Sequence, residues 1–228
     1  ATDLEIWTDV SGMMTADPRL VPNAKIIPQI SYQEAMELSH FGAKVIYPPT
    51  IQPVMNKGIP VWIKNTFAPQ DAGTLIQQKV SENNSSITGI SSISSIALLS
   101  LEGSGMVGIP GFSKRLFEAL ASKKINVILI TQSSSEHSIC VGIEENNASS
   151  AKQIIDEAFA YEIEIKKVEP LIVEKNLSII ALVGDRMKNH TGVSGKFFSA
   201  LGRNGVNIRA IAQGSSERNI TAVISNAD

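Results

Sequence analysis

Amide side chains recur at a fixed spacing in the second half of this chain. Residues 111–143 align with residues 192–224 without a gap, at an offset of 81, and 13 of the 33 pairs are identical. A hydrophobic core requires apolar residues to recur, but it gives no reason for an amide to recur. We therefore interpret the two copies as two related binding sites. The repeated positions of interest are Gly111, Asn126 and Gln132 in the first copy, and Gly192, Asn207 and Gln213 in the second.

These residue types suit the binding of an amino acid or another small zwitterion. In each copy a glycine precedes an expected helix, and the free backbone N–H groups of a helix N-terminus can hold a carboxylate. We expect the asparagine to begin the next strand beside that glycine loop, and the glutamine to lie at the far end of the same strand. Amide side chains both donate and accept hydrogen bonds. The alternative is that these polar residues only cap turns.

The elements that must position these residues follow the order strand, helix, strand, strand. In the first copy we expect strands at 96–101, 127–131, 138–143 and 167–173, and helices at 112–123 and 150–161. This is the βαββαβ pattern of a ferredoxin-like domain. The second copy stops before its second helix and fourth strand. Residues 87–90 alternate enough to form a short strand, which would supply the missing strand from upstream and nest the first repeat inside the second.

The residues before the repeats predict an α/β fold. They alternate strand, helix and strand, and Ser31 with Glu34 forms a capping box that begins a helix. Between residues 81 and 95, seven of the 15 residues are serine and two are asparagine, which is typical of a linker. The expected organisation is a first domain at 1–80, a linker at 81–95 with a short strand at 87–90, a first repeat at 96–174 and a second, truncated repeat at 175–228.

Composition excludes several classes of protein. The net charge of −2 does not favour a nucleic-acid surface, which would need a basic stripe, and an RNA-binding sheet would need aromatic residues that the strands at 127–131 and 207–212 lack. His, Asp, Glu and Cys form no metal-ligand spacing. The single cysteine, Cys140, excludes an internal disulfide. No apolar run approaches the roughly 20 residues of a membrane helix, and no secretory signal is present, so we expect a cytoplasmic protein. Both ends look cut, which indicates a fragment.

Several motifs together resemble one family. The run Glu5–Arg19, which reads EIWTDVSGMMTADPR, is similar to the nucleotide loop of aspartokinases. The blocks at 31–45, 58–66 and 73–76 are similar to the rest of that family's kinase domain, in family order. The doubled motif Gln-x-Ser-Ser-Glu at 132–136 and 213–217 resembles the paired ACT domains that follow it. The chain resembles most the bifunctional aspartokinase–homoserine dehydrogenases, over its whole length.

The resemblance implies a fold and a function. Residues 1–80 would be the C-terminal half of an amino-acid-kinase domain, followed by two ACT domains. The whole enzyme would transfer the γ-phosphoryl group of ATP, with Mg²⁺, to the β-carboxylate of L-aspartate, in the biosynthesis of threonine, lysine and methionine. The implied nucleotide-binding residues are Thr8, Asp9, Met14, Arg19, Lys44 and Val45. The repeats would bind an end-product amino acid, with threonine favoured over lysine, and would assemble the chain into a homodimer or larger oligomer.

Three positions depart from the family pattern. Ser11 stands where an acidic residue is common, Met14 stands where an aromatic is common, and residues 47–50 replace a His-Pro-Arg-Thr block. The glycine-rich phosphate loop and catalytic lysine of the family are absent, so we expect no catalytic residue and no aspartate phosphorylation from this chain. An alternative is an ACT-type amino-acid-binding and dimerisation module without nucleotide binding. A nucleotide-dependent enzyme complete in itself is opposed by the missing phosphate loop.

Overall fold

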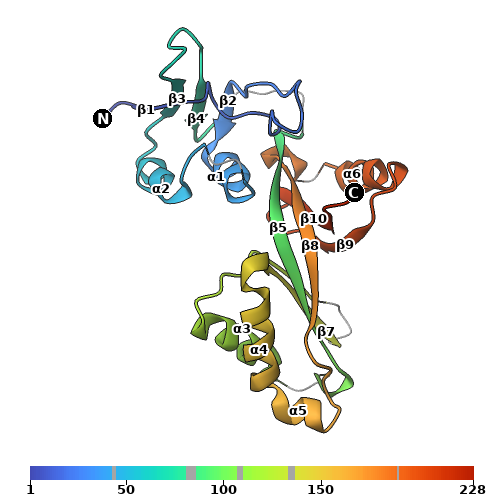
Figure 1. Cartoon of the computed structure of the whole chain (residues 1–228). Coiled ribbons are helices and arrows are strands. Elements are labelled where there is room, and N and C mark those ends of the chain that lie inside the picture. The colour runs from blue at the N-terminus through green and yellow to red at the C-terminus, as the bar shows by residue number, and fades with distance from the viewer. Residues whose placement is uncertain (43–44, 81–85, 107–109, 133–136, 189) are drawn as a thin grey trace. The chain divides into compact units, whose positions relative to one another are not determined.

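The computed structural model describes residues 1–42, 45–80, 86–106, 110–132, 137–188 and 190–228. They form two compact units. Unit 1 contains residues 1–93, 180–206 and 213–222, and unit 2 contains residues 94–179, 207–212 and 223–228. Figure 1 shows the elements of both units. Among the described residues, no helix is long and apolar enough to cross a membrane.

A four-stranded sheet with two helices forms the first part of unit 1. Its strand order is β1-β3-β4-β2, with β1 parallel to β3, β3 antiparallel to β4, and β2 parallel to β4. The helices α1 and α2 lie on one side of this sheet (Figure 1). The elements are β1 (Leu4–Thr8), β2 (Gln29–Ser31), α1 (Tyr32–His40), α2 (Pro48–Asn56), β3 (Val61–Asn65) and β4 (Thr74–Gln77). This agrees with the expected α/β pattern.

The predicted capping box at the start of α1 is confirmed. The Ser31 hydroxyl accepts a hydrogen bond from the Glu34 backbone N–H at 3.1 Å, and the Glu34 carboxylate accepts one from the Ser31 N–H at 3.1 Å. Both side chains are buried. The two bonds satisfy backbone donors that a helix N-terminus otherwise leaves without a partner.

Thr74, the first residue of β4, holds the segment 5–19 that resembles a nucleotide loop. The hydroxyl of Thr74, which is fully buried, donates to the Ile27 carbonyl at 2.7 Å and accepts from the Met13 N–H at 2.9 Å. Gly12 adopts φ +143°, and a Cβ at this position would overlap the same hydroxyl. Only glycine combines that backbone conformation with so close an approach, which explains the Ser-Gly turn in the motif.

A six-stranded sheet carries the two repeats, in the order β6-β7-β5-β8-β10-β9. The described elements are β5 (Gly89–Glu102), α3 (Phe112–Ser122), β6 (Leu129–Gln132), β7 (Ser138–Glu144), α4 (Ala148–Ala158), α5 (Ala160–Glu164), β8 (Ile172–Val183), α6 (Val193–Arg203), β9 (Ile208–Ala212) and β10 (Asn219–Ser225), with short 3₁₀ turns at Ser104–Met106, Glu145–Asn147 and Asp185–Met187. The first four strands of this order belong to the first repeat. The order β9-β10-β8-β5 repeats the same pattern, so β5 and β8 each serve both repeats.

The strand that completes the second repeat therefore comes from upstream, as the nesting prediction required. Two details differ from the sequence-based expectation. The upstream segment begins at Gly89 and continues without a break through residues 91–95, which we expected to be linker. The strand expected at 167–173 is also different, because β8 covers Ile172–Val183 and residues 167–171 are not strand. Pairing along a neighbouring strand overrides the low strand propensity of the serines.

The centres of these two long strands share a backbone feature. Ser95 in β5 has φ +60° and Asn176 in β8 has φ +59°, and the two residues are 81 positions apart, which is the offset of the repeat. A positive φ is uncommon for residues other than glycine. The repeat is therefore present in the backbone conformation as well as in the residue types.

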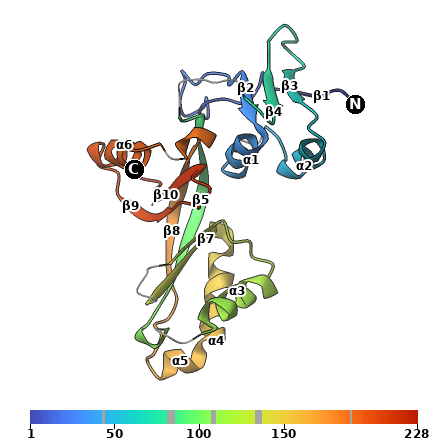
Figure 2. The same cartoon turned by 180° about the vertical axis from the view of Figure 1, so that it is seen from behind.

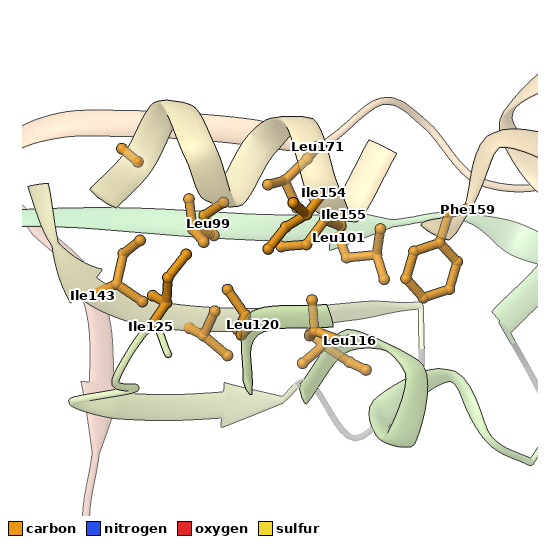
Figure 3. Packing of buried hydrophobic residues seen from close by; sticks show 14 of the residues in the cluster. Leu99, Leu101, Leu116, Leu120, Ile125, Ile143, Ile154, Ile155, Phe159 and Leu171 are labelled. Carbon is orange, nitrogen blue, oxygen red and sulfur yellow. The ribbon is translucent and has the colours of Figure 1, made fainter. Parts of the chain in front are cut away.

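The core of unit 2 lies between the sheet and the helices α3 and α4, which cover the same face of it in the view of Figure 1 and from behind in Figure 2. Leu99 and Leu101 of β5 face Ile155 of α4 and Leu116 of α3 in Figure 3. At one end, the rings of Phe112 and Phe159 stack with centroids 5.6 Å apart. The apolar stripes of both helices account for this layer.

Candidate effector and nucleotide sites

The two glycines at the helix starts share one backbone conformation. Gly111 is the N-cap of α3 with φ +105°, and Gly192 is the N-cap of α6 with φ +85°. A left-handed residue at the N-cap explains why glycine recurs at this position. Residues 107–109, the rest of the first glycine loop, lie outside the described residues. A backbone reason of this kind does not apply to the repeated amides.

The amides are exposed. Gln132 is the last residue of β6, and Gln213 follows the last residue of β9. Asn126 and Asn207 lie before the same strands, and all four side chains are exposed. The remainder of the first Gln-x-Ser-Ser-Glu motif, residues 133–136, lies outside the described residues. Exposure leaves these amides available to a ligand.

The prediction that Asn126 lies beside the glycine loop is wrong. Asn126 follows the C-terminal end of α3, while Gly111 precedes its N-terminus, and an 11-residue helix separates them by about 16 Å. Gln132 is the residue at the glycine end instead, because Gln132 pairs with Ile139 and Glu102 pairs with Ser138. In a βαβ crossover the helix runs antiparallel to both strands, so its N-terminus lies near the C-terminal ends of those strands.

Strands β6 and β9, the outermost strands of the order, approach one another within unit 2, with Cα atoms closer than 8 Å. β6 runs parallel to β5, because both strands pair antiparallel with β7. The bonds from Thr88 N to the Val183 carbonyl and from Glu169 N to the Glu102 carbonyl show that β5 and the segment that contains β8 are antiparallel. Gln132, the last residue of β6, and Asn207, which directly precedes β9, therefore belong to strands that approach one another.

A cavity of about 160 Å³ lies beside the N-terminus of α3. Arg115 lines it and is held by Glu162 of α5 through N–O distances of 2.5 and 3.0 Å. The Arg115 guanidinium also lies 4.4 Å from the centre of the Phe159 ring. These hydrogen bonds from Arg115 hold the pKa of the Glu162 carboxyl below its usual range. The arginine therefore already has a carboxylate partner.

The expected nucleotide residues are in part brought together. Thr8 ends β1 and its hydroxyl donates to the Asp9 carboxylate at 3.0 Å, and ligands of α/β sheets lie at this end of the strands. Met14 bridges to Ile26, and Val45 is half-buried. Lys44 lies outside the described residues.

Arg19 is bonded to Asp17. Its guanidinium forms a salt bridge with Asp17 at 2.7 Å, and its side chain is 84% exposed. The hydrogen bonds from Arg19 lower the pKa of the Asp17 carboxyl. A phosphate contact from Arg19 would require this exposed pair to open, which needs little energy.

Sequence reasoning missed a polar cluster at the same end of the sheet. Asn65 ends β3 opposite Thr8, and its amide donates to the Ser11 hydroxyl at 2.8 Å. The Ser11 hydroxyl in turn donates to the Asp71 carboxylate at 2.5 Å. Asp71 thus places a carboxylate beside the position where we noted the loss of an acidic residue. The signal was not visible in sequence because Asp71 is 60 residues from Ser11.

The fold and these sites define the class of the protein. Residues 1–65 match the amino acid kinase family, and residues 99–159 and 180–228 match the ACT domain. The chain is thus part of an amino acid kinase domain joined to a tandem ACT module.

Relatives over the whole chain specify the family further. The chain is 48% identical over 224 residues to the bifunctional aspartokinase/homoserine dehydrogenase of Haemophilus influenzae, covering 98% of this chain and 28% of that protein. It is 40% identical to a bifunctional aspartokinase/homoserine dehydrogenase of Arabidopsis thaliana, covering 99% of this chain and 25% of that protein. The chain belongs to the aspartokinase family, and it spans about a quarter of the length of these relatives.

Solved structures agree with this membership. The Clostridium acetobutylicum aspartate kinase is 33% identical with a TM-score of 0.87, and this chain spans 52% of it. Aspartokinase III of E. coli, solved in complex with aspartate and ADP, is 33% identical with a TM-score of 0.81 over 50% of that chain. A second structure of aspartokinase III contains lysine and aspartate and is described as the T-state.

Proposed function

We propose that this chain is the regulatory part of an aspartokinase, together with part of its nucleotide site. The whole protein would phosphorylate the β-carboxylate of L-aspartate with ATP and Mg²⁺, in the biosynthesis of threonine, lysine and methionine. The repeated amides at the end of one strand in each ACT repeat carry the proposal, because neither burial nor backbone conformation requires them. Relatives at up to 48% identity over nearly the whole chain support it.

The effector is an amino acid, with threonine favoured and lysine the alternative. Asn126 and Gln132 of one repeat are separated by roughly 20 Å, the length of six extended residues, so one small ligand cannot contact both. Gln132 ends β6 and Asn207 directly precedes β9, two strands that approach one another in unit 2, so we take them as the pair that one zwitterion can bridge. Gln213 is the corresponding glutamine of the second repeat. Gly111 and Gly192 supply helix N-termini for the carboxylate.

Calorimetric titration with L-threonine, L-lysine and L-methionine tests this proposal. We expect threonine to bind the wild-type chain, and Gln132→Ala and Asn207→Ala each to weaken binding about 10-fold or more, because a lost hydrogen bond to a charged ligand is worth ~1.5–3 kcal/mol. Gln153→Ala is the matched control, since Gln153 is exposed on α4 and bonds only to Glu157 in the described part of the chain. Gln213→Ala reports on the second repeat in the same way.

The outcomes separate the possibilities. Binding of lysine in place of threonine would retain the regulatory function and change the effector. Loss of binding in Gln132→Ala but not in Asn207→Ala would place the site within one repeat or across two chains. Absence of binding for all three amino acids would contradict the effector function and favour a dimerisation module.

The nucleotide-binding part is a second component of the proposal. Thr8, Asp9, Met14, Arg19, Lys44 and Val45 would contact the nucleotide, with Asn65 and Asp71 orienting the loop beneath it. Binding of a fluorescent ATP analogue with Mg²⁺ tests this part. Asp9→Asn should weaken binding, whereas Asp3→Asn, at the exposed N-terminus, should not. Equal affinities for both variants and the wild type would contradict it.

We also propose a homodimer or larger assembly through the ACT domains. Ile130 and Ile211 occupy the same position of the two repeats on the outermost strands, and their exposed fractions are 53% and 45%. Large apolar residues at repeated exposed positions favour an interface. Ile130→Lys should lower the sedimentation coefficient if the strand is in the interface. The cytoplasmic location stays a prediction, since plant relatives are named as chloroplastic.

A further inference from the structure

Helix α1 and the second repeat are joined inside unit 1 by a group of polar side chains, which we name the α1 junction. Its members are Ser31, Glu34, Thr88, Asp185 and Arg218. The Ser31 hydroxyl donates to the Asp185 carboxylate at 2.5 Å, and the Asp185 backbone N–H donates to the Glu34 carboxylate at 2.9 Å. The Thr88 hydroxyl donates to the same oxygen of Glu34. The capping box of α1 is thus bonded to the loop that follows β8.

Arg218 extends the α1 junction toward the candidate effector residues. Its Nε donates to the Asp185 carboxylate at 2.7 Å, and its carbonyl accepts from the Gly184 N–H at 2.9 Å. Arg218 directly follows the second Gln-x-Ser-Ser-Glu motif, which begins at Gln213. The next residue, Asn219, donates from its amide to the Glu37 carboxylate of α1 at 2.7 Å. The chain after the motif is therefore bonded to α1 directly through Asn219 and indirectly through Arg218 and Asp185.

The first repeat lacks this ion pair, although its backbone is the same. At the offset of 81, Ser104 corresponds to Asp185 and His137 corresponds to Arg218. The backbone bond is conserved, since the Gly103 N–H donates to the His137 carbonyl at 3.0 Å. Both repeats therefore share this backbone hydrogen bond, but only the second repeat adds the ion pair between Asp185 and Arg218. The pair is specific to the repeat that contacts α1.

Burial divides the α1 junction into a rigid part and a part that can change. Ser31 and Glu34 are 3% and 6% exposed, and a buried carboxylate must keep its hydrogen bonds. The side chains of Asp185 and Arg218 are 30% and 42% exposed, so their ion pair can open with little loss of energy. A cavity of about 400 Å³ borders Ser31, Glu34 and Asp185, which leaves room for Asp185 to move.

We propose that the Asp185–Arg218 ion pair transmits the ligand state of the second repeat to the N-terminus of α1. This inference rests on the proposed function, because it takes the residues that begin at Gln213 to bind the effector. Ordering of that segment by a ligand moves Arg218, and Arg218 repositions Asp185. Asp185 holds the Ser31 hydroxyl, which is the acceptor for the first turn of α1. The chain then leads from α1 to residues 44 and 45, which we assign to the nucleotide.

Hydrogen exchange of the intact chain tests this inference, with the Glu34 amide as reporter, since that amide donates to the Ser31 hydroxyl. Without ligand, Arg218→Ala should speed exchange at the first turn of α1 about two- to five-fold. Asp185→Asn should have a similar effect. Arg209→Ala is the matched control, because it removes a similarly exposed salt bridge, from β9 of the second repeat to Glu174 of β8 at 3.0 Å, and it should leave α1 unchanged.

Addition of L-threonine then measures the transmission. Exchange in α1 of the wild type and of Arg209→Ala should change when threonine binds. Arg218→Ala should still bind threonine by calorimetry, within about three-fold, and should show no further change in α1. Ligand-free Arg218→Ala that exchanges like the wild type, or a full threonine response in that variant, would overturn the inference. Failure of the wild type to bind any of the three amino acids would overturn the proposed function, and with it this inference, because no ligand would then act on the segment that begins at Gln213.

Discussion

Arg115 should contribute about 1.5 kcal/mol to the stability of unit 2. Its guanidinium donates to both oxygens of Glu162, at 2.5 and 3.0 Å, and to the Ala158 carbonyl at 2.5 Å. It also covers the Phe159 ring. A hydrogen-bonded ion pair of this kind is worth ~1–2 kcal/mol and a cation–π contact ~0.5–1 kcal/mol. The Arg115 side chain is 39% exposed, so solvent screens the pair and the sum stays near the lower end of these values.

Urea unfolding of Arg115→Ala measures this contribution. Trp7 and Trp62 are the two tryptophans of the chain and both lie in unit 1, so tryptophan fluorescence reports unit 1 while circular dichroism reports both units. We expect the dichroism transition of unit 2 to move to lower urea by about 1 M, with the fluorescence transition unchanged. Lys196, the residue equivalent to Arg115 in the second repeat, is exposed. Lys196→Ala should change stability by less than ~0.5 kcal/mol.

The pH dependence provides a second check. Arg115 lowers the pKa of Glu162 below its ordinary value of 4.5, so the folded state binds this proton more weakly than the unfolded state does. The stabilisation is therefore complete above pH 4.5 and is lost as the pH falls through the lowered pKa. The difference between wild type and Arg115→Ala should shrink in acid. A difference that is equal at pH 3 and pH 7, or absent at pH 7, would refute the reasoning.

Other substitutions test the backbone and the core. Gly12→Ala should lower the free energy of unfolding by more than ~1 kcal/mol, because it adds a strained φ and a clash with Thr74. Gly195 lies in α6 with open space around it. Gly195→Ala should therefore raise the free energy of unfolding, measured by thermal unfolding, by ~0.5–1 kcal/mol. Thr74→Val should cost about 1–3 kcal/mol, measured by tryptophan fluorescence in urea, since it leaves a buried carbonyl and N–H without partners. Burial raises the pKa of the Cys140 thiol. Disulfide exchange of this thiol with a chromogenic reagent at pH 8 should therefore be slow in the folded chain and fast in urea. Equal rates in the two conditions would contradict the burial of Cys140.

Features that depend on local sequence were predictable. The capping box of Ser31 and Glu34 follows from residues three apart, and each lies where the sequence placed it. The glycine at each helix start follows from a repeat that is visible in the residues themselves. In both cases the residues that determine the structure are neighbours in the chain or copies at one fixed offset.

Features that depend on pairing across the chain were not predictable. Residues 91–95 are strand because they border β8, although serine has little strand preference of its own. The glycine loop was expected beside Asn126, the wrong end of β6, because the direction of a crossover is a property of the whole unit. The contacts of Ser11 with Asp71 and of Ser31 with Asp185 join residues 60 and 154 positions apart, which no local pattern encodes.

During synthesis, the first part of β5 must wait for the second repeat before it can pair. Thr88, just before that strand, bonds to Val183, which a ribosome adds about 95 residues later, or roughly 5–20 s at ordinary rates of synthesis. During that interval the strand has no partner, and an apolar strand with free edges is prone to aggregate. Four of the seven residues from Gly89 to Ser95 are serine. The serine-rich composition of residues 89–95, which resembles a linker, thus lowers the tendency of this strand to aggregate before the second repeat is synthesised.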